Sequence, residues 1–123
     1  MPARILAPVL QLIIGAVLLN VWLVRARHST AYRGGAALSL KQEFAEYGLP
    51  QALFYVVGTL KVISGVILIA GIWLPLPVAS AASVVVALMI GAIAMHIRKK
   101  DPLVKSVPAA LVLALSAALL IVI

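Results

Sequence analysis

Four long apolar runs dominate the chain, and each is long enough to cross a bilayer. A hydrocarbon core of about 30 Å needs about 20 residues of helix at roughly 1.5 Å each. The four runs are residues 5–24, 53–73, 77–97 and 103–123. Backbone groups in hydrocarbon must bond to one another, so each run is predicted to be an α-helix. The pattern therefore predicts an all-α membrane protein, with a four-transmembrane-helix bundle that forms a single domain over residues 1–123.

Two of the three connections between these runs are short. Residues 74–77 are Leu-Pro-Leu-Pro, a tight apolar turn, because proline cannot continue the preceding helix but fits the first turn of the next. Residues 98–102 form the second short turn. These connections predict antiparallel neighbours.

The third connection, residues 25–52, is long enough to contain structure of its own. Ser39 and Gln42 have the spacing of a helix capping box. Leu40, Phe44 and Tyr47 follow at helical spacing on one face, between polar residues. We expect a short amphipathic helix over residues 39–47, at the membrane interface or tucked under the bundle.

Composition excludes several classes of protein. Hydrophobic residues make up 65% of the 123 residues and charged residues 11%, against about 45–50% and about 25% in soluble domains. A soluble enzyme, a disordered tail and a disulfide scaffold are therefore excluded. The net charge of +7 does not indicate nucleic acid, since no basic stripe with interleaved aromatic residues exists. With no cysteine, and with two histidines that lack metal-ligand spacing, no metal site is predicted.

The basic residues predict an orientation in the membrane. Eight of the ten lie in the connections that should share one side: Arg25, Arg27, Arg33, Lys41, Arg98, Lys99, Lys100 and Lys105. Arg4 alone lies on the other side, and Lys61 is inside the second run. Because positive loops stay in the cytoplasm, we expect cytoplasmic charged connections and outward termini, in a bacterial inner membrane.

Lys61 is the most unusual residue of the four runs. It lies near the middle of the second run, where a charged lysine costs roughly 2.5–3.5 kcal/mol on insertion scales. It should therefore face the bundle interior, and Gly58 and Gly65 on the same helix face should let another helix come close. Two interpretations stay open: a ligand, proton or partner site, or a lysine bonded to an internal hydroxyl or carbonyl group.

A polar pocket around Lys61 is the predicted ligand or partner site. It should open toward the side that carries Glu46, Tyr47 and His96. The alternatives are a solvated Glu46 and interfacial aromatic residues. Asp101 is expected to act as a local cap at the end of the third helix. The candidate pocket residues are Lys61, Ser64, Gly58, Gly65, Glu46, Tyr47, Tyr55, His96 and Gln11. No catalytic residue is predicted, because no nucleophile–base pair and no phosphate-binding loop is present.

Three features in a fixed order resemble the DoxX-like family of small four-helix membrane proteins. The first is Tyr47-Gly48-Leu49-Pro50 before the second helix, and the second is the Gly58-x-x-Lys61-x-x-x-Gly65 pattern within it. The third is His96 followed by Asp101-Pro102-Leu103 and an alanine-rich last helix. The resemblance covers about residues 40–123. Many family members carry Glu at the position of Lys61.

The resemblance implies two functions. The first is a non-enzymatic accessory protein that binds another membrane protein through its transmembrane faces, as in the branch similar to NACHO, a receptor-assembly chaperone. The second is a quinone- or lipid-binding subunit of a membrane redox system, with Lys61 and His96 near the headgroup. Transport of small solutes is less favoured, because four short helices leave little lumen. Membrane lipids, a second membrane protein and further copies of the chain are the expected partners. Self-association is expected along small-residue rows such as Ser83, Ala87 and Gly91.

Overall fold

The computed structural model describes residues 3–24 and 39–123, and this part of the chain is helical with no strand. The helices are α1 (Ala3–Leu19), α2 (Leu40–Glu46), α3 (Gln51–Ala70), α4 (Val78–Arg98) and α5 (Val107–Val122). A π-helical turn, η1 (Asn20–Val24), extends α1, and a 3₁₀ turn, η2 (Leu103–Ser106), precedes α5. Four spans are long and apolar enough to cross a membrane: Ile5–Leu23, Gln51–Ala70, Val78–Arg98 and Leu103–Val122. The predicted four-helix membrane fold is confirmed.

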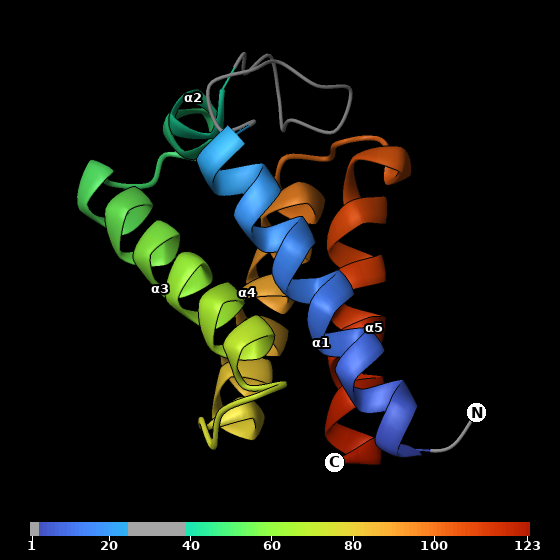
Figure 1. The fold of residues 1–123 in the computed structure, drawn as a ribbon. Coiled ribbons are helices and arrows are strands. Elements are labelled where there is room, and N and C mark those ends of the chain that lie inside the picture. The colour runs from blue at the N-terminus through green and yellow to red at the C-terminus, as the bar shows by residue number, and fades with distance from the viewer. Residues whose placement is uncertain (1–2, 25–38) are drawn as a thin grey trace.

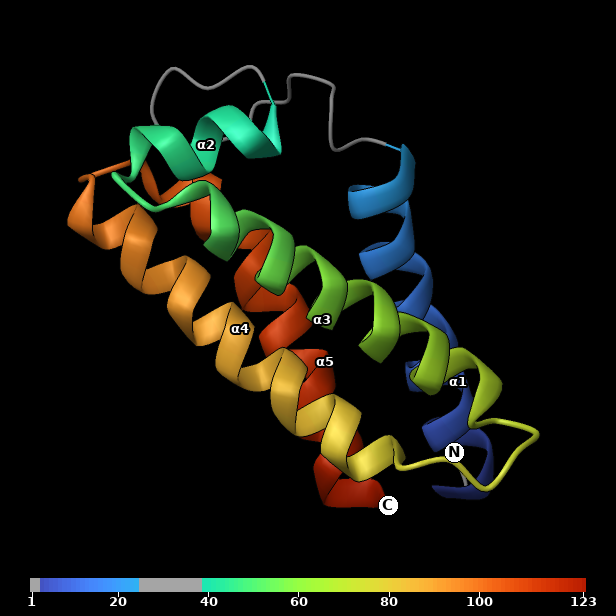
Figure 2. The same cartoon turned by 90° about the vertical axis from the view of Figure 1, so that its left-hand side faces the viewer.

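The four long helices form a ring in which each packs against two neighbours, in the order α1, α3, α4, α5 (Figures 1 and 2). The start of α1 and the end of α5 lie at one end of this ring, and α2 lies across the other end (Figure 1). Each long helix contributes a large, fully buried apolar side chain to the core: Ile14, Leu68, Val85 and Leu119. Most other apolar side chains of the spans are not buried, as expected where lipid is the solvent.

Two helix boundaries differ from the predicted ones for reasons connected with proline. The second span ends at Ala70 rather than near residue 73, because the Ile72 and Trp73 N–H groups donate to carbonyls three residues back, at Ile69 and Ala70, before the chain reaches Pro75. The turn to α4 closes with Val78 N–H donating to the Leu76 carbonyl at 2.8 Å. Pro77, with φ −76° and ψ 70°, is the centre of this inverse γ-turn. The last helix begins at 103 as a 3₁₀ turn, because the ring of Pro108 would clash with the Val104 carbonyl in a continuous α-helix.

The short helix α2 occupies most of the range predicted for it. The Gln42 N–H donates to Ser39 Oγ at 3.2 Å, which is the capping bond that the spacing of these residues indicates. The helix ends at Glu46, and Gly48 follows it with a φ of 71°, in the left-handed region that glycine adopts freely. The amphipathic character of α2 stays a prediction, because some of its side chains are outside the described set.

Helices α1 and α3 approach closely through two glycines. A Cβ atom added at Gly15 would lie 2.5 Å from Ile69 Cγ1 and 2.8 Å from the Gly65 carbonyl oxygen. A Cβ atom at Gly65 would lie 3.2 Å from Leu19 and 3.3 Å from the Gly15 carbonyl oxygen. The expectation that Gly65 lets another helix come close therefore holds, and Gly15 is its counterpart on α1.

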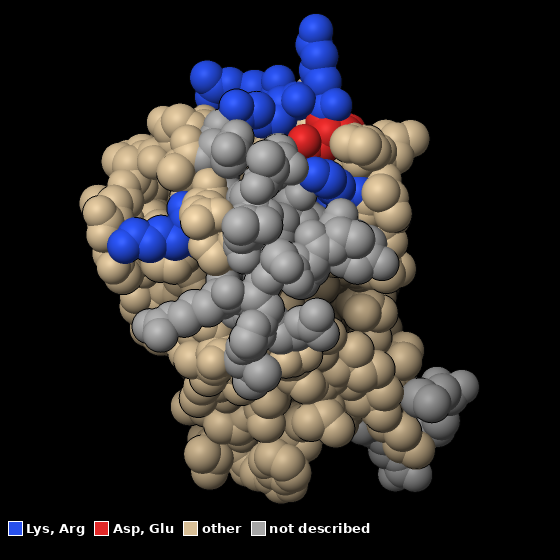
Figure 3. All heavy atoms as spheres, turned by 90° about the horizontal axis from the view of Figure 1, so that it is seen from above, with Lys and Arg blue, Asp and Glu red and all other residues tan. Residues whose placement is uncertain are grey.

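Lys and Arg side chains gather at the end of the bundle that carries α2. Figure 3 views this end and shows the basic side chains beside a small acidic patch. Exposed members of the described set are Lys41, Arg98, Lys99 and Lys100. The opposite end has the apolar turn at residues 74–77 and the apolar C-terminus. The two ends of the bundle therefore differ strongly in charge.

Candidate functional site

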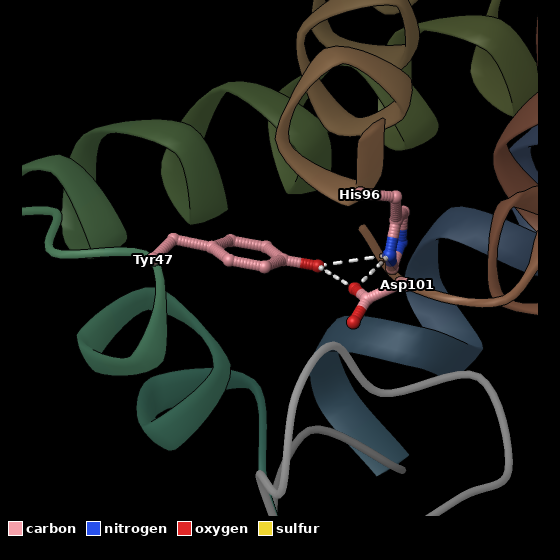
Figure 4. A network of polar contacts seen from close by, with 3 residues as sticks. All are labelled: Tyr47, His96 and Asp101. Atoms are coloured by element: carbon pink, nitrogen blue, oxygen red, sulfur yellow. Dashed lines mark hydrogen bonds and ion pairs between the residues drawn. The ribbon is translucent and has the colours of Figure 1, made fainter. Parts of the chain in front are cut away.

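Three side chains from distant parts of the chain form a buried polar network beneath α2 (Figure 4). The Tyr47 hydroxyl lies 2.8 Å from His96 Nδ1 and donates to Asp101 Oδ2 at 3.1 Å. His96 Nδ1 lies 2.9 Å from the same carboxylate oxygen. Tyr47 and His96 are 7% and 5% exposed, and the Asp101 side chain is 6% exposed. The network is therefore part of the protein interior.

The end of α4 brings Asp101 to His96. The Asp101 N–H donates to the His96 carbonyl, and the Lys100 N–H donates to the Ile97 carbonyl, both at 3.0 Å. This bonding pattern is a Schellman motif, and Lys100 with φ 57° occupies the left-handed position usually taken by glycine. The motif folds the chain back over the last turn of α4. The two side chains, five residues apart, therefore meet.

The same motif at the end of α2 positions Tyr47. The Leu49 N–H donates to the Phe44 carbonyl and the Gly48 N–H to the Ala45 carbonyl, both at 3.0 Å. Tyr47 is the last residue before the left-handed Gly48, and its ring meets the His96 ring edge-on at a centroid distance of 5.8 Å. The ends of α2 and α4 are thus connected by Tyr47, His96 and Asp101, which the two capping motifs bring together.

The proton positions in this network follow from the chemistry of its members. An ionised carboxylate only accepts hydrogen bonds, so Nδ1 of His96 carries a hydrogen toward Asp101 Oδ2. The Tyr47 hydroxyl donates to the same oxygen and can accept from the shared Nδ1–H. The carboxylate thus selects the tautomer of the imidazole ring. Such a network can hold α2 on the bundle.

Lys61 lies beside an aromatic ring. It is the eleventh of the 20 residues of α3, and its Nζ atom is 5.3 Å from the centroid of the Trp22 ring. A cation at this distance is attracted by the face of the ring. Gly58, one turn earlier, makes room for the indole, because a Cβ atom there would lie 2.5 Å from Trp22 Cζ3.

Trp22 belongs to an aromatic cluster that joins η1, α2 and α3. Its ring lies 5.2 Å from that of Phe54 and 6.2 Å from that of Phe44, and the two Phe rings lie 5.5 Å apart. The π-helical turn η1 carries Trp22 to this position. π-Helical turns are frequent at functional sites.

A groove of about 640 Å³ opens beside this cluster, and we call it the α3 groove. One wall is Trp22, the floor runs along α3, and the start of α2 lies over one end. The lining residues are Trp22, Ser39, Lys41, Phe54, Tyr55, Gly58, Thr59, Val62 and Ile63. Its volume is within the usual range of small-molecule sites, about 300–1,000 Å³.

The residues predicted for one pocket occupy separate places. Tyr47 and His96 meet in the buried network, whereas Gly58 and Lys61 contact Trp22, and Tyr55 lines the α3 groove. Gln11 donates to the Leu68 carbonyl at 2.9 Å, seven residues or about 10 Å beyond Lys61 along α3.

Gly65, another candidate of that pocket, lies at the contact between α3 and α1. Ser64 is buried beside Gly65, which faces α1. The side chain of Glu46 lies outside the described set. Their predicted role in binding a ligand or partner stays a prediction.

Two residues of these sites are not among the sequence candidates. Asp101 was expected to act as a local cap, and its N–H does close the capping motif of α4, but its carboxylate also contacts His96 and Tyr47. A glycine at position 100 would have indicated the Schellman motif that brings Asp101 back to His96. Trp22 gives no such signal, because its partner helix is decided by tertiary packing.

A double-mutant cycle between Trp22→Leu and Lys61→Met tests the contact of the cation with the ring. We expect the two substitutions to be non-additive by about 1–2 kcal/mol in the free energy of unfolding, the size of a desolvated cation–π contact. The measurement is titration of the micellar protein with a denaturing detergent, followed by near-UV circular dichroism. Additive losses would show that Lys61 gains nothing from the indole.

The fold and the sites together define the class of protein. It is a small integral membrane protein with four membrane-spanning helices, and α2 lies across its charge-rich end. A sequence model of the DoxX-like family matches residues 29–119, and the chain therefore belongs to the DoxX-like family. The match covers more than half of the chain and includes α2, α3, α4 and most of α5. Searches of the curated proteins and of the solved structures found no match.

Proposed function

We propose that this protein is a non-enzymatic accessory protein that binds a transmembrane helix of another membrane protein, in an assembly role like that of the NACHO branch. One observation carries the proposal: a row of small residues on the outer face of α4. Ser83, Ala87 and Gly91 are each four residues apart and exposed. Small residues let a second helix approach closely in lipid, where packing drives association.

The row is smooth as well as exposed. A Cβ atom at Gly91 would meet nothing within 4 Å, and the Ser83 hydroxyl donates to the Ala79 carbonyl at 2.8 Å. The hydroxyl thus needs no lipid or partner to satisfy it. A helix of a second protein, or of a further copy of this chain, fits such a surface.

Site-specific photocrosslinking in native membranes tests this proposal. A crosslinker at Ala87 is expected to give a discrete adduct with one other membrane protein, and Gly91→Leu should reduce that adduct about ten-fold. A crosslinker at Leu111, exposed on α5, is the matched control. Equal adducts from both positions would contradict the proposal, and an adduct of twice the chain mass would show self-association instead.

We further propose that the charge-rich end lies in the cytoplasm of a bacterial cell and that both termini face outward. The chain has no cysteine, so single cysteines can be introduced without background. In intact cells, an impermeant maleimide should label Leu76→Cys and not Lys99→Cys. The reverse pattern would invert the orientation.

A second candidate function, a lipid- or quinone-binding subunit of a membrane redox system, is favoured by the α3 groove. The groove combines an aromatic wall with a polar end formed by Ser39 and Lys41. Mass spectrometry of lipids and quinones retained by the purified protein tests it. Retention of neither, in the gentlest detergent that keeps the fold, would contradict this candidate.

A further inference from the structure

We propose that the α3 groove binds one phospholipid with an anionic headgroup, whose phosphate lies at Lys41 and one of whose acyl chains follows α3. This inference rests on the second candidate function and names its ligand class. It depends on the shape of the groove, on the order of its lining residues and on the sign of its charge.

The floor of the groove is a path along the exposed face of α3. Tyr55, Thr59 and Ile63 follow at four-residue spacing, and all three are exposed. They span about 12 Å of helix, which is the length of an acyl-chain segment rather than of a compact polar ligand. Gly58 lies between this row and Trp22, and the lack of a side chain there lets the indole pack against α3 as the wall of the groove.

The chemistry of the lining changes along this path. At the α2 end are Ser39, Lys41 and the Tyr55 hydroxyl, which also accepts a bond from Gln51 Nε2 at 3.4 Å. Farther along are Val62 and Ile63. Thr59 donates its hydroxyl to the Tyr55 carbonyl at 2.8 Å, so its methyl group is left for the groove. A lipid in one leaflet has the same order, with its headgroup at the interface and its chains deeper.

The sign of the charge selects an anionic headgroup. Among the described lining residues, Lys41 alone is charged, and it lies at the end of the bundle where basic side chains gather (Figure 3). A phosphate or phosphatidylglycerol-type headgroup neutralises this ammonium group. A quinone headgroup is neutral and does not, and a zwitterionic headgroup adds a cation of its own.

Quenching of Trp22 fluorescence by brominated lipid tests the proposal. The chain has two tryptophans, and Trp73 is 75% exposed at the opposite end, so Trp73→Phe leaves Trp22 as a reporter in the groove wall. The protein is placed in phosphatidylcholine vesicles that contain a small fraction of brominated phosphatidylglycerol or brominated phosphatidylcholine. We expect phosphatidylglycerol to quench with about five-fold higher apparent affinity, the factor that one lysine contributes at a membrane surface.

Variants of single lysines test whether the preference for phosphatidylglycerol depends on Lys41. Lys41→Gln should abolish it and Lys41→Arg should restore it, whereas Lys99→Gln, an exposed lysine at the same end, should leave it unchanged. Circular dichroism confirms that each variant is folded. Equal quenching by both lipids overturns the proposal. An equal loss in Lys41→Gln and Lys99→Gln also overturns it, since the basic end would then attract anionic lipid without a site.

A quinone arm separates this inference from the function on which it rests. In this experiment a neutral long-chain quinone is the quencher of Trp22. If Lys41→Gln does not change the quenching, and added phosphatidylglycerol does not reduce it, the groove is assigned to quinone. That result overturns the phospholipid and keeps the second candidate function. If neither ligand quenches Trp22 more than it quenches Trp73 in the Trp22→Phe variant, both fail.

Discussion

Gly15→Ala is expected to lower the free energy of unfolding by about 2–3 kcal/mol, the upper range of overpacking costs. The added methyl group would lie 2.8 Å from the Gly65 carbonyl oxygen, which belongs to the backbone of α3 and cannot rotate away. Helices α1 and α3 must then separate, and the separation also disturbs Ile69, 2.5 Å from the new atom. Unfolding in mixed micelles, monitored by Trp22 fluorescence in a Trp73→Phe background, measures the loss.

A graded series of glycine variants makes this prediction specific. Gly65→Ala should cost less, because its nearest contacts are at 3.2 and 3.3 Å. Gly91→Ala should be neutral or stabilising by up to about 1 kcal/mol, since alanine is the better helix former and nothing lies within 4 Å of the new atom. If all three variants had equal stability, the close contact of α1 and α3 would be wrong.

Asp101→Asn is expected to cost about 2 kcal/mol and to loosen α2 without unfolding the four spans. The substitution removes the charge that accepts from both Tyr47 and His96 inside the protein, and hydrogen bonds to charged groups contribute about 1.5–3 kcal/mol. Hydrogen exchange should accelerate at the amides of residues 40–49 and stay unchanged in the middle of α4. Tyr47→Phe should reproduce the effect at about half the size, because it removes the hydroxyl but keeps the ring contact with His96.

Lys99→Gln is the control for this second prediction. It removes a charge from the same connection, but Lys99 is exposed, and surface charges contribute little. Its exchange pattern should match that of the parent protein. Unchanged exchange in α2 of Asp101→Asn would show that the network does not hold this helix.

The four spans were predictable because backbone groups in hydrocarbon must be hydrogen-bonded, and a helix forms these bonds between residues close in sequence. Their ends were predicted within a few residues. The errors lie where proline changes the neighbouring turn, as at Ala70 and at the 3₁₀ turn before Pro108. The capping bond between Ser39 and Gln42 was also predictable, because both partners lie within one turn of the chain.

The sites were predictable only in part. Tyr47 and His96 could be chosen as polar or amphipathic residues near one end of the bundle, and the structure joins them. The choice of Trp22 as the neighbour of Lys61 depends on which helix packs beside α3, and residues 39 positions apart in sequence carry no sign of it. Gln11 and Lys61 were assigned to one pocket, but α1 places Gln11 beside Leu68 instead.

The sequence by itself determined the environment of the protein, the number of spans and the end at which its charges collect. Each of these depends on local composition, because transfer into a bilayer is a sum over neighbouring residues. The tertiary structure alone decided which distant residues reach one another: Gly15 on Gly65, Trp22 over Lys61 and Tyr47 on His96. In lipid, apolar side chains do not distinguish a neighbouring helix from the solvent. Pairing is therefore decided by close packing and by hydrogen bonds, which exist only once the helices are assembled.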